Sequence, residues 1–322
     1  MLINKEIDKD MVIENPPINY EFKKIIGQIE SESQNDVNPR GLLVKESILT
    51  TINIDPLYPC VDFETRPFNW KYFAGELAWY LSKSRETDLI DKFSNFWKNI
   101  KNEDGTVNSN YGNILLTKAE EIKANSWSLK DSIDRNLGTS QMAWVVNSLK
   151  KDKFSRQAIA YIGGSKFQYE GNKDFVCTQY LLFFIRDNRL NLKVQMRSND
   201  VFYGLTYDAP WFSTVHQNIY LELLETYPTL KLGKYIHCSD NSHFYERHFK
   251  IVESIKSEKN ILYGPKLQLK NPLWISDASG NSTLTQMSKD YLDIILRLTK
   301  NPSEHTDEDY IAALSFLFKI TK

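Results

Sequence analysis

Apolar and polar positions recur along this chain with two different periods, which predict a mixture of helices and strands. Apolar stripes with helical spacing lie in six stretches: 20–29, 70–82, 141–150, 212–226, 285–299 and 308–320. Runs of strand-forming residues lie at 42–54, 158–162, 181–185, 190–196 and 235–238. We find no internal repeat and no low-complexity tract in the sequence. The pattern alone therefore predicts an α+β fold.

Two of the predicted strands form a hairpin that brings a cysteine close to an arginine. Asp187 and Asn188 separate these strands, and both residue types tolerate the positive φ angles of a tight two-residue turn. Pairing outward from this turn places Cys177 opposite Ser198 and beside Arg197, with directly opposed side chains about 5 Å apart. A β-bulge would shift the register by one residue, so the prediction is adjacency rather than an exact pairing.

A thiol beside a guanidinium group is an arrangement that activates cysteine as a nucleophile. A free cysteine has a pKa near about 8.5, and a neighbouring cation stabilises the thiolate. The alternative is that Cys177 is a small buried hydrophobe, as most free cysteines are. The motifs around Cys177 decide between these two interpretations.

Composition limits the class of protein. The 322 residues carry 40 basic and 41 acidic side chains, a formal charge of −1. This balance argues against a broad nucleic-acid surface but leaves room for a local phosphate pocket. An apolar share of 41% is enough for a substantial core. No apolar run reaches the roughly 18 residues of a membrane span, and the first residues lack a signal-peptide pattern.

The cysteines favour a reducing compartment. The three of them are widely spaced and are not arranged as metal-binding pairs: Cys60, Cys177 and Cys238. We therefore expect a cytoplasmic protein without a metal site, which binds neither membrane nor nucleic acid.

Six short motifs resemble those of the thymidylate synthase superfamily, and more closely its phage-type deoxycytidylate (dCMP) hydroxymethylase and CMP hydroxymethylase branch. They lie in the chain at 76–80, 108–112, 155–156, 175–178, 196–201 and 242–245. The resemblance implies a thymidylate synthase-like mixed β-sheet with surrounding helices, whose sheet face packs on a second copy in a homodimer. It divides the chain into an N-terminal extension with a helix, a catalytic domain, and a helical C-terminal appendage packed on the same domain: 1–37, 38–253 and 254–322.

The resemblance implies a folate-dependent transfer of a one-carbon unit to carbon 5 of a pyrimidine nucleoside monophosphate. Addition of a cysteine thiolate to carbon 6 makes carbon 5 enamine-like, so that it attacks the one-carbon unit of 5,10-methylenetetrahydrofolate. By this match Cys177 is the nucleophile, and Tyr111 assists proton removal from carbon 5. Glu76 matches the catalytic glutamate, and the apolar helix around it supports this role because burial raises a carboxylate's pKa.

The residues that recognise phosphate follow from the same match. Arg197 and Ser198 correspond to phosphate ligands, since guanidinium forks suit phosphate oxygens. Arg156 matches an arginine that the partner subunit lends to the site. Arg40 is a looser candidate for a mobile phosphate-binding loop.

The sugar and the folate have their own matched residues. His243 and Tyr245, two positions apart on a predicted strand, project to one face and match the pair that binds the sugar hydroxyl. Asp200 matches the aspartate that binds the folate pterin. The other histidines of this region are expected to be core or surface residues: His216, His237 and His248.

Asp208 is predicted to select the base. It stands where uracil-specific synthases carry asparagine and where the hydroxymethylase branch carries aspartate. A carboxylate accepts from the exocyclic amine of cytosine and can share a proton with its ring nitrogen, whereas it repels the carbonyl of uracil. We therefore predict 5-hydroxymethylation of dCMP or CMP.

Further positions bear on this prediction. Thr178 and Met196 follow the hydroxymethylases, because the synthases carry histidine and glutamine there. Gln157 stands where both groups carry a second arginine, which weakens the match of the phosphate and sugar pocket. Ser198 favours the deoxy sugar, but CMP stays open as a substrate. The alternatives are a C5-methyltransferase acting on dUMP or dCMP, and a noncatalytic nucleotide-binding module.

Overall fold

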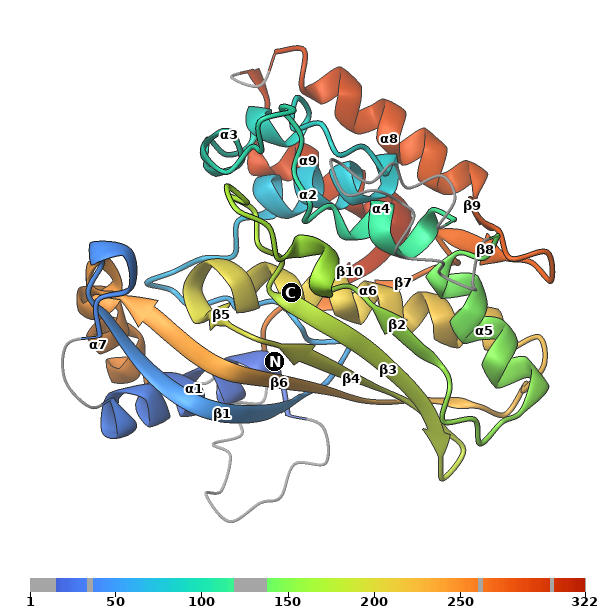
Figure 1. Cartoon of the computed structure of the whole chain (residues 1–322), viewed down its shortest axis with the longest axis horizontal. Coiled ribbons are helices and arrows are strands. Elements are labelled where there is room, and N and C mark those ends of the chain that lie inside the picture. The colour runs from blue at the N-terminus through green and yellow to red at the C-terminus, as the bar shows by residue number, and fades with distance from the viewer. Residues whose placement is uncertain (1–15, 34–36, 119–137, 260–262, 302–303, 322) are drawn as a thin grey trace.

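The computed structural model describes residues 16–33, 37–118, 138–259, 263–301 and 304–321, and one mixed sheet lies at its centre (Figure 1). The strands run in the order β1–β6–β4–β3–β2, with β5 beside β6. Strands β4 and β5 run parallel to β6, and the other pairs are antiparallel. The strands are β1 (Val44–Ile54), β2 (Ile159–Tyr161), β3 (Thr178–Arg186), β4 (Arg189–Met196), β5 (Asn199–Asp200) and β6 (Lys231–Tyr245).

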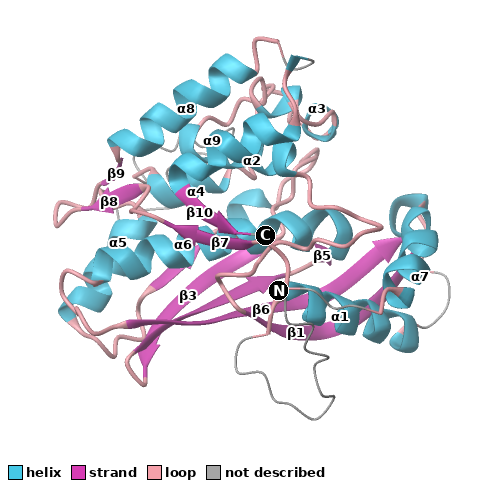
Figure 2. Cartoon of the chain, turned by 180° about the vertical axis from the view of Figure 1, so that it is seen from behind, coloured by secondary structure: helices cyan, strands magenta, loops and turns pink. Residues whose placement is uncertain are grey.

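Helices pack against one face of this sheet and above its upper edge. Helices α1 and α6 lie on the rear face in Figure 1, and the view from behind shows them in front of the strands (Figure 2). Helices α2, α8 and α9 pack on one another at the upper edge. The helices are α1 (Ile18–Glu32), α2 (Trp70–Ser82), α3 (Phe96–Asn99), α4 (Tyr111–Leu116), α5 (Gln141–Lys151), α6 (Thr206–Leu223), α7 (Phe249–Ser257), α8 (Gln286–Leu298) and α9 (Asp307–Leu317). The predicted α+β fold is confirmed.

Two predicted elements are longer in the structure than the sequence pattern indicated. Helix α6 begins at Thr206 rather than at 212, because Pro210 lies within the helix and normally marks a boundary. Strand β6 extends far beyond the predicted 235–238 through a polar stretch. That stretch is compatible with a buried strand because its hydroxyl groups are hydrogen-bonded; Ser242 Oγ, for example, lies 2.6 Å from Thr50 Oγ1.

The C-terminal segment is attached to helix α6 through buried polar side chains. Gln217 Nε2 donates to the carbonyl of Leu267 at 2.9 Å, and the amide of Leu269 donates back to Gln217 Oε1 at 2.7 Å. Asn218 Oδ1 accepts from the amide of Leu273 at 2.6 Å. These bonds satisfy buried backbone groups that would otherwise be costly. They hold the short strands β7 (Lys266–Leu269) and β8 (Trp274–Ser276), the latter paired with β9 (Ser282–Leu284).

The end of the chain departs from the predicted helix at 308–320. Helix α9 ends at Leu317, and Phe318–Thr321 form β10, which pairs antiparallel with β7. The apolar pattern of the sequence continues past the end of the helix, because Phe318 is buried in β10 just as an apolar residue of the helix would be. In the part of the chain that the structure describes, no helix is long and apolar enough to cross a membrane.

Helices α2 and α4 approach each other unusually closely. A Cβ atom added at Gly112 would lie 1.7 Å from the carbonyl oxygen of Tyr80, so only glycine fits at this contact. Asn110 caps α4 and donates to the carbonyls of Trp79 and Ser84, each at 2.8 Å. This contact fixes the start of α4, and therefore Tyr111, relative to the helix that carries Glu76.

Candidate active site

Cys177 and Arg197 face each other where the β3–β4 hairpin ends. Positive φ angles at Asp187 and Asn188 close the predicted turn at the other end. Arg197 Nη2 lies 3.5 Å from Cys177 Sγ. The guanidinium is held there by the carbonyls of Val176 and Phe175, at 3.1 and 2.6 Å, and it lies 4.6 Å from the centre of the Phe175 ring. The half-buried thiol therefore has a fixed cation beside it, which stabilises the thiolate form.

The register of the hairpin differs by one residue from the simple prediction. The pairing shifts between Thr178 and Tyr180, where a β-bulge inserts one residue on β3. As a result the amide of Arg197 donates to the carbonyl of Cys177 at 2.9 Å, and Arg197 rather than Ser198 stands opposite the thiol. The bulge shifts the register by the one residue that the sequence left open, and Cys177 and Arg197 are adjacent as predicted.

Tyr111 is connected to the same strand end. Its hydroxyl accepts a hydrogen bond from Thr178 Oγ1 at 2.9 Å, and its ring stacks between Tyr80 and Phe212 at 5.5 and 5.6 Å. Burial raises the pKa of Tyr111 well above its usual value, and the neighbouring charges of Asp208 and Cys177 raise it further. The phenol therefore stays protonated and lies within electrostatic reach of the nucleophile.

Asp174 joins the Tyr111 loop to the Cys177 loop, which sequence reasoning did not identify. Its Oδ2 accepts from the backbone amides of Asn108 and Ser109 at 2.6 and 2.7 Å. Burial raises the pKa of Asp174, while these donors oppose the shift. Because Asp174 lies three positions before Cys177 in the chain, its carboxyl fixes the spacing between the two loops.

Glu76 lies in the interior of α2, as predicted, with its side chain buried. Tyr72 donates to Glu76 Oε1 at 2.9 Å. Burial raises the pKa of Glu76 to about 8, the hydrogen bonds from Tyr72 and Tyr80 oppose this, and the charge of Asp208 adds to it. At neutral pH this carboxyl therefore holds a proton that it can pass on.

Asp208 ends a chain of hydrogen bonds that starts in the sheet. Asn199 Nδ2 donates to Asp208 Oδ2 at 2.9 Å, and Asn199 Oδ1 lies 3.2 Å from His237 Nε2. The other ring nitrogen, His237 Nδ1, lies 2.8 Å from the hydroxyl of Tyr235. Because the amide oxygen of Asn199 can only accept, His237 Nε2 donates to it. The other nitrogen of the neutral ring, Nδ1, then accepts from the hydroxyl of Tyr235.

The charges of this chain follow from burial. Burial lowers the pKa of His237 to about 3, so the ring is neutral and has one donor and one acceptor nitrogen. Burial also raises the pKa of the half-buried Asp208 to about 7, against the hydrogen bond from Asn199. His237 is a core residue, as expected, but it also orients Asn199. The signal in the sequence was the alternation of Tyr235, His237 and Ser239 on one face of a strand.

The predicted sugar and folate residues lie together at the end of the sheet beyond this chain. Asp200 on β5 pairs with His243 on β6, and the His243 ring lies 5.4 Å from the ring of Tyr245. Asp200 Oδ1 accepts from the amides of Phe202 and Tyr203 at 2.8 and 3.2 Å. Burial raises the pKa of Asp200 and lowers that of His243, and each charge opposes the shift of the other.

The remaining predicted residues are less closely connected to this cluster. Ser198 follows Arg197 and is half-buried. Arg156 is exposed between α5 and β2, and among the described residues it makes no hydrogen bond or ion pair with the site. Arg40 lies in the short 3-10 helix Pro39–Gly41, and its side chain is outside the described part of the structure.

The chain is similar to proteins of one known family. A family model described as Thymidylate synthase matches residues 21–284. The deoxycytidylate 5-hydroxymethyltransferase of Enterobacteria phage T6 is 31% identical over 192 residues, which cover 58% of this chain and 71% of that protein. The thymidylate synthase of Mycoplasma genitalium is 25% identical over 221 residues, or 64% of this chain and 74% of that protein.

A solved structure extends the likeness of the fold over most of the chain. The thermostable thymidylate synthase A from Bacillus subtilis superposes with a TM-score of 0.60 at 20% sequence identity. The match covers 84% of this chain and 95% of the other.

We predict that the stability of the protein decreases as the pH rises, and that Glu76 causes much of this decrease. A raised pKa means that the folded state keeps a proton which the unfolded state has released. The contribution of Glu76 to stability is therefore fully present below about pH 4.5 and is lost progressively as the pH rises to about 8. Glu76→Gln stays neutral and should flatten the dependence by on the order of a few kcal/mol. Urea titrations at pH 5 to 9 measure this pH dependence of the free energy of unfolding.

The exposed Glu103 provides the control for this experiment. Its carboxylate is hydrated in both states, so Glu103→Gln should leave the pH dependence of the unfolding free energy as in the wild type. A Glu76→Gln protein with the same pH dependence as the wild type would show that Glu76 is ionised in the fold.

Proposed function

Because this chain belongs to the thymidylate synthase family, we propose that it transfers a one-carbon unit to carbon 5 of a cytosine nucleoside monophosphate and releases the 5-hydroxymethyl product. The observation that carries the choice of cytosine is the carboxyl of Asp208, with a pKa of about 7 and with Asn199 donating to Oδ2. The similar phage proteins named as deoxycytidylate 5-hydroxymethyltransferases support the same choice.

The base is selected by the protonation of Asp208. A carboxyl with a pKa of about 7 is partly protonated at neutral pH, so one oxygen can donate to the ring nitrogen of cytosine while the other accepts from its exocyclic amine. Asn199 cannot turn its amide freely, because His237 holds the oxygen end. Asp208 Oδ2 therefore always accepts from Asn199 and serves as an acceptor. Uracil has a carbonyl in place of the amine of cytosine, so two acceptors would face each other without a hydrogen bond.

The thiol of Cys177 supplies the covalent step. The sulfur forms a bond to carbon 6 of the base, and the electron pair released toward the ring makes carbon 5 nucleophilic. Arg197 stabilises the thiolate before attack through its 3.5 Å contact, and it can bind the phosphate of the nucleotide as well. The carbon 5 proton then leaves, with Tyr111 close to the strand end that carries Cys177. Before that proton leaves, carbon 5 would have bonded to the one-carbon unit. Tetrahydrofolate would then be the leaving group, and water would add to the methylene carbon and supply the hydroxyl oxygen. Loss of the sulfur from carbon 6 restores the aromatic ring and regenerates the thiolate.

Methylenetetrahydrofolate, which this family uses, supplies the one-carbon unit when it is bound. The residues present fit such a cosubstrate. Asp200 offers a carboxylate to the amino-substituted ring, and both of its backbone hydrogen bonds end on Oδ1. The Tyr203 side chain is 58% exposed beside it, so a planar ring can stack there. Glu76 holds a proton close to the base and can pass it to the group that leaves.

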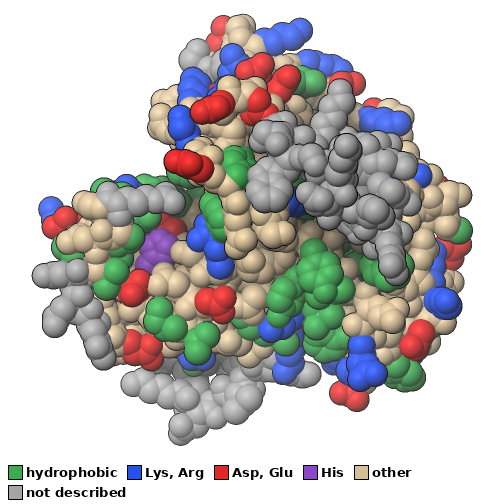
Figure 3. Space-filling view, in the orientation of Figure 1, with side chains coloured by type: hydrophobic (Ala, Val, Ile, Leu, Met, Phe, Trp, Pro, Cys, Tyr) green, Lys and Arg blue, Asp and Glu red, His purple; other side chains and the backbone are tan. Residues whose placement is uncertain are grey.

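We further propose that the chain forms a homodimer in which the open faces of the two sheets pack on each other. Side chains on that face are half-buried and partly apolar, such as Leu182 and Phe184 on β3. Figure 3 shows hydrophobic side chains gathered over β2 and β3 on the same side. Phe154 and Tyr161, on either side of Arg156 in the chain, are 63% and 60% exposed. An exposed apolar area of this kind favours a protein partner.

The products of the reaction test the proposed function directly. With methylenetetrahydrofolate, we expect the protein to convert dCMP or CMP to the 5-hydroxymethyl nucleotide, which is heavier by CH2O, and to leave dUMP and UMP largely unchanged. Mass analysis of the four incubations identifies the product and the preferred sugar. A methylated product with dihydrofolate, detected by its absorbance, would show a C5-methyltransferase instead. No release of hydrogen from carbon 5 in any incubation would favour a binding module.

Asp208→Asn should shift the preference from cytosine toward uracil. The asparagine removes the negative charge and the shared proton, and it presents a donor and an acceptor to uracil. Because unpaired buried groups discriminate strongly, the ratio of kcat/KM for cytidylate to that for uridylate should fall by about tenfold or more. Asp200→Asn is the matched control, and it should raise KM for the folate without changing this ratio. An unchanged ratio in Asp208→Asn would assign base selection to other residues.

Mixed dimers test whether Arg156 reaches the partner's site. Cys177→Ser and Arg156→Ala chains are each expected to be inactive alone, but a mixed dimer retains one site with both wild-type residues. Activity should therefore return to about half of the wild-type value per mixed dimer. Mixing Cys177→Ser with Glu76→Gln should restore nothing, because both residues belong to one chain's site. No recovery in the first mixture, with subunit exchange confirmed, would contradict the shared site.

A further inference from the structure

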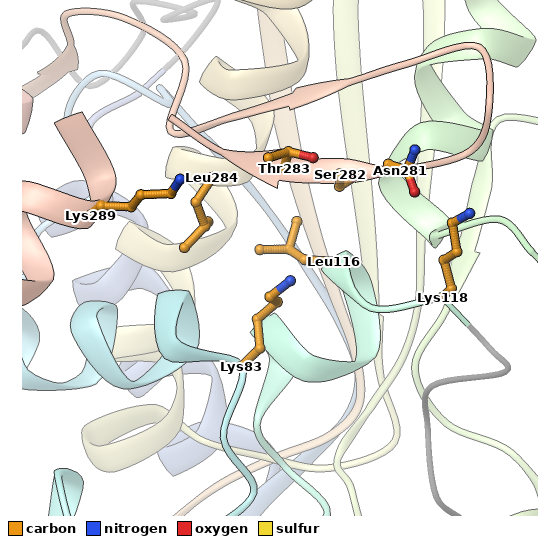
Figure 4. A pocket seen from close by; sticks show the side chains of 8 residues that line it. All are labelled: Lys83, Leu116, Lys118, Asn281, Ser282, Thr283, Leu284 and Lys289. Carbon is orange, nitrogen blue, oxygen red and sulfur yellow. The ribbon is translucent and has the colours of Figure 1, made fainter. Parts of the chain in front are cut away.

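A cavity lined by three lysines lies apart from the active-site residues. It has a volume of about 310 Å³, within the range of small-molecule sites, and no carboxylate is among the described residues that line it (Figure 4). The lysines come from three separate parts of the chain: Lys83 follows α2, Lys118 follows α4 and Lys289 belongs to α8. The other described lining residues are Leu116, Asn281, Ser282, Thr283 and Leu284.

The three ammonium groups gather positive charge without acidic partners in the lining. None of the ion pairs among the described residues includes Lys83, Lys118 or Lys289. Lys118 Nζ reaches the carbonyl of Ser279 at only 3.4 Å, and it lies close enough to Asp277 to help lower the pKa of that carboxyl. Among the described lining residues no carboxylate offsets these three charges, so the cavity would attract an anion.

The backbone of Lys83 gives a second, independent indication. Lys83 is the C-cap of α2 and has a φ of 57°, in the left-handed region. Glycine or asparagine is favoured at such a position, because a Cβ atom destabilises it. A lysine in this conformation is strained backbone that carries an ammonium group into the cavity, and strain of this kind is characteristic of functional positions.

The surroundings fit a small, multiply charged anion. In Figure 4, Lys289 extends toward Leu284, Lys83 toward Leu116, and Lys118 lies at the Asn281 end, so the charges are spread along the cavity. Lys289 lies in the first turn of α8, whose backbone N–H groups add positive potential. Three spaced cations and a hydroxyl at Thr283 suit a chain of phosphate groups better than a single carboxylate.

We infer that this cavity binds an oligophosphate, either inorganic triphosphate or the phosphate chain of a nucleoside triphosphate, at a second site separate from the nucleotide that reacts. Its position connects it to the active site. Lys83 ends the helix that holds Glu76, and Leu116 ends the helix that begins at Tyr111. The carbonyl of Lys83 also accepts from Asn113 of the second helix at 2.9 Å, so an anion held by Lys83 contacts the junction of both helices.

A second cavity of the same volume provides the matched control. It is lined in part by Glu86, Asp88 and Lys92, so its single lysine is accompanied by two acids. Removing the Lys92 charge therefore alters the total charge of the protein by the same amount as removing Lys83 or Lys289. It does not alter the three-lysine cavity.

Titration calorimetry of the full chain tests the inference, with dCMP in excess to occupy the active site and salt at roughly 0.1 M. Inorganic triphosphate, a nucleoside triphosphate and cytidine are titrated separately. We expect both phosphates to bind and cytidine not to bind. Lys83→Gln and Lys289→Gln should each weaken binding about fivefold or more, and Lys92→Gln less than about twofold. Binding of the nucleoside triphosphate alone would show that its base contributes.

Lys83→Gly separates a ligand-binding role from a structural one. Glycine relieves the left-handed backbone, so this variant should melt at a higher temperature than the wild type while it binds triphosphate as weakly as Lys83→Gln. The inference is overturned if wild-type protein binds neither phosphate, or if the lysine variants bind as tightly as the Lys92→Gln control. Neither result depends on turnover, and only the use of dCMP to fill the active site rests on the proposed function.

Discussion

The backbone hydrogen bond from Arg197 to Cys177 closes the end of the β3–β4 hairpin, and the other groups of the site are arranged around it. A bulge on β3 sets this register, so the guanidinium rather than a serine faces the thiol. Thr178, the next residue, binds the hydroxyl of Tyr111, and Asn199, two residues after Arg197, binds Asp208. A shift of one residue would turn every one of these side chains to the opposite face.

Burial keeps two carboxyls that lie within electrostatic reach of each other at least partly protonated at neutral pH. Burial raises the pKa of Glu76 to about 8 and that of Asp208 to about 7, and the charge of Asp208 raises the pKa of Glu76 further. Ionising both at once would be costly, so a proton is retained where the chemistry of a pyrimidine needs one. The hydrogen bonds from Tyr72 and Asn199 orient these carboxyls before any substrate binds.

The sequence was sufficient to predict what depends on local pattern and short spacing. Helix α2 was predicted to its bounds, because its apolar residues recur with helical spacing over a continuous stretch of the chain. The bulge on β3 was not located from the sequence, because it breaks the alternation at Gln179 and Tyr180, before the apolar run of the strand begins. The link from Asn199 to His237 was also missed. It depends on the parallel pairing of β5 with β6, between residues almost forty positions apart.

The most direct test of the account is to trap the bond between Cys177 and the base. A cytidylate with fluorine at carbon 5 can accept the thiolate, but carbon 5 then carries fluorine in place of the proton that must leave, so the adduct should persist. With methylenetetrahydrofolate present, the intact mass of the chain should rise by one nucleotide and one folate, with the modification mapped to Cys177. Cys177→Ser should show no adduct although it still binds the nucleotide. An unmodified wild-type chain that binds both ligands, or an adduct on Cys60 or Cys238, would contradict the account.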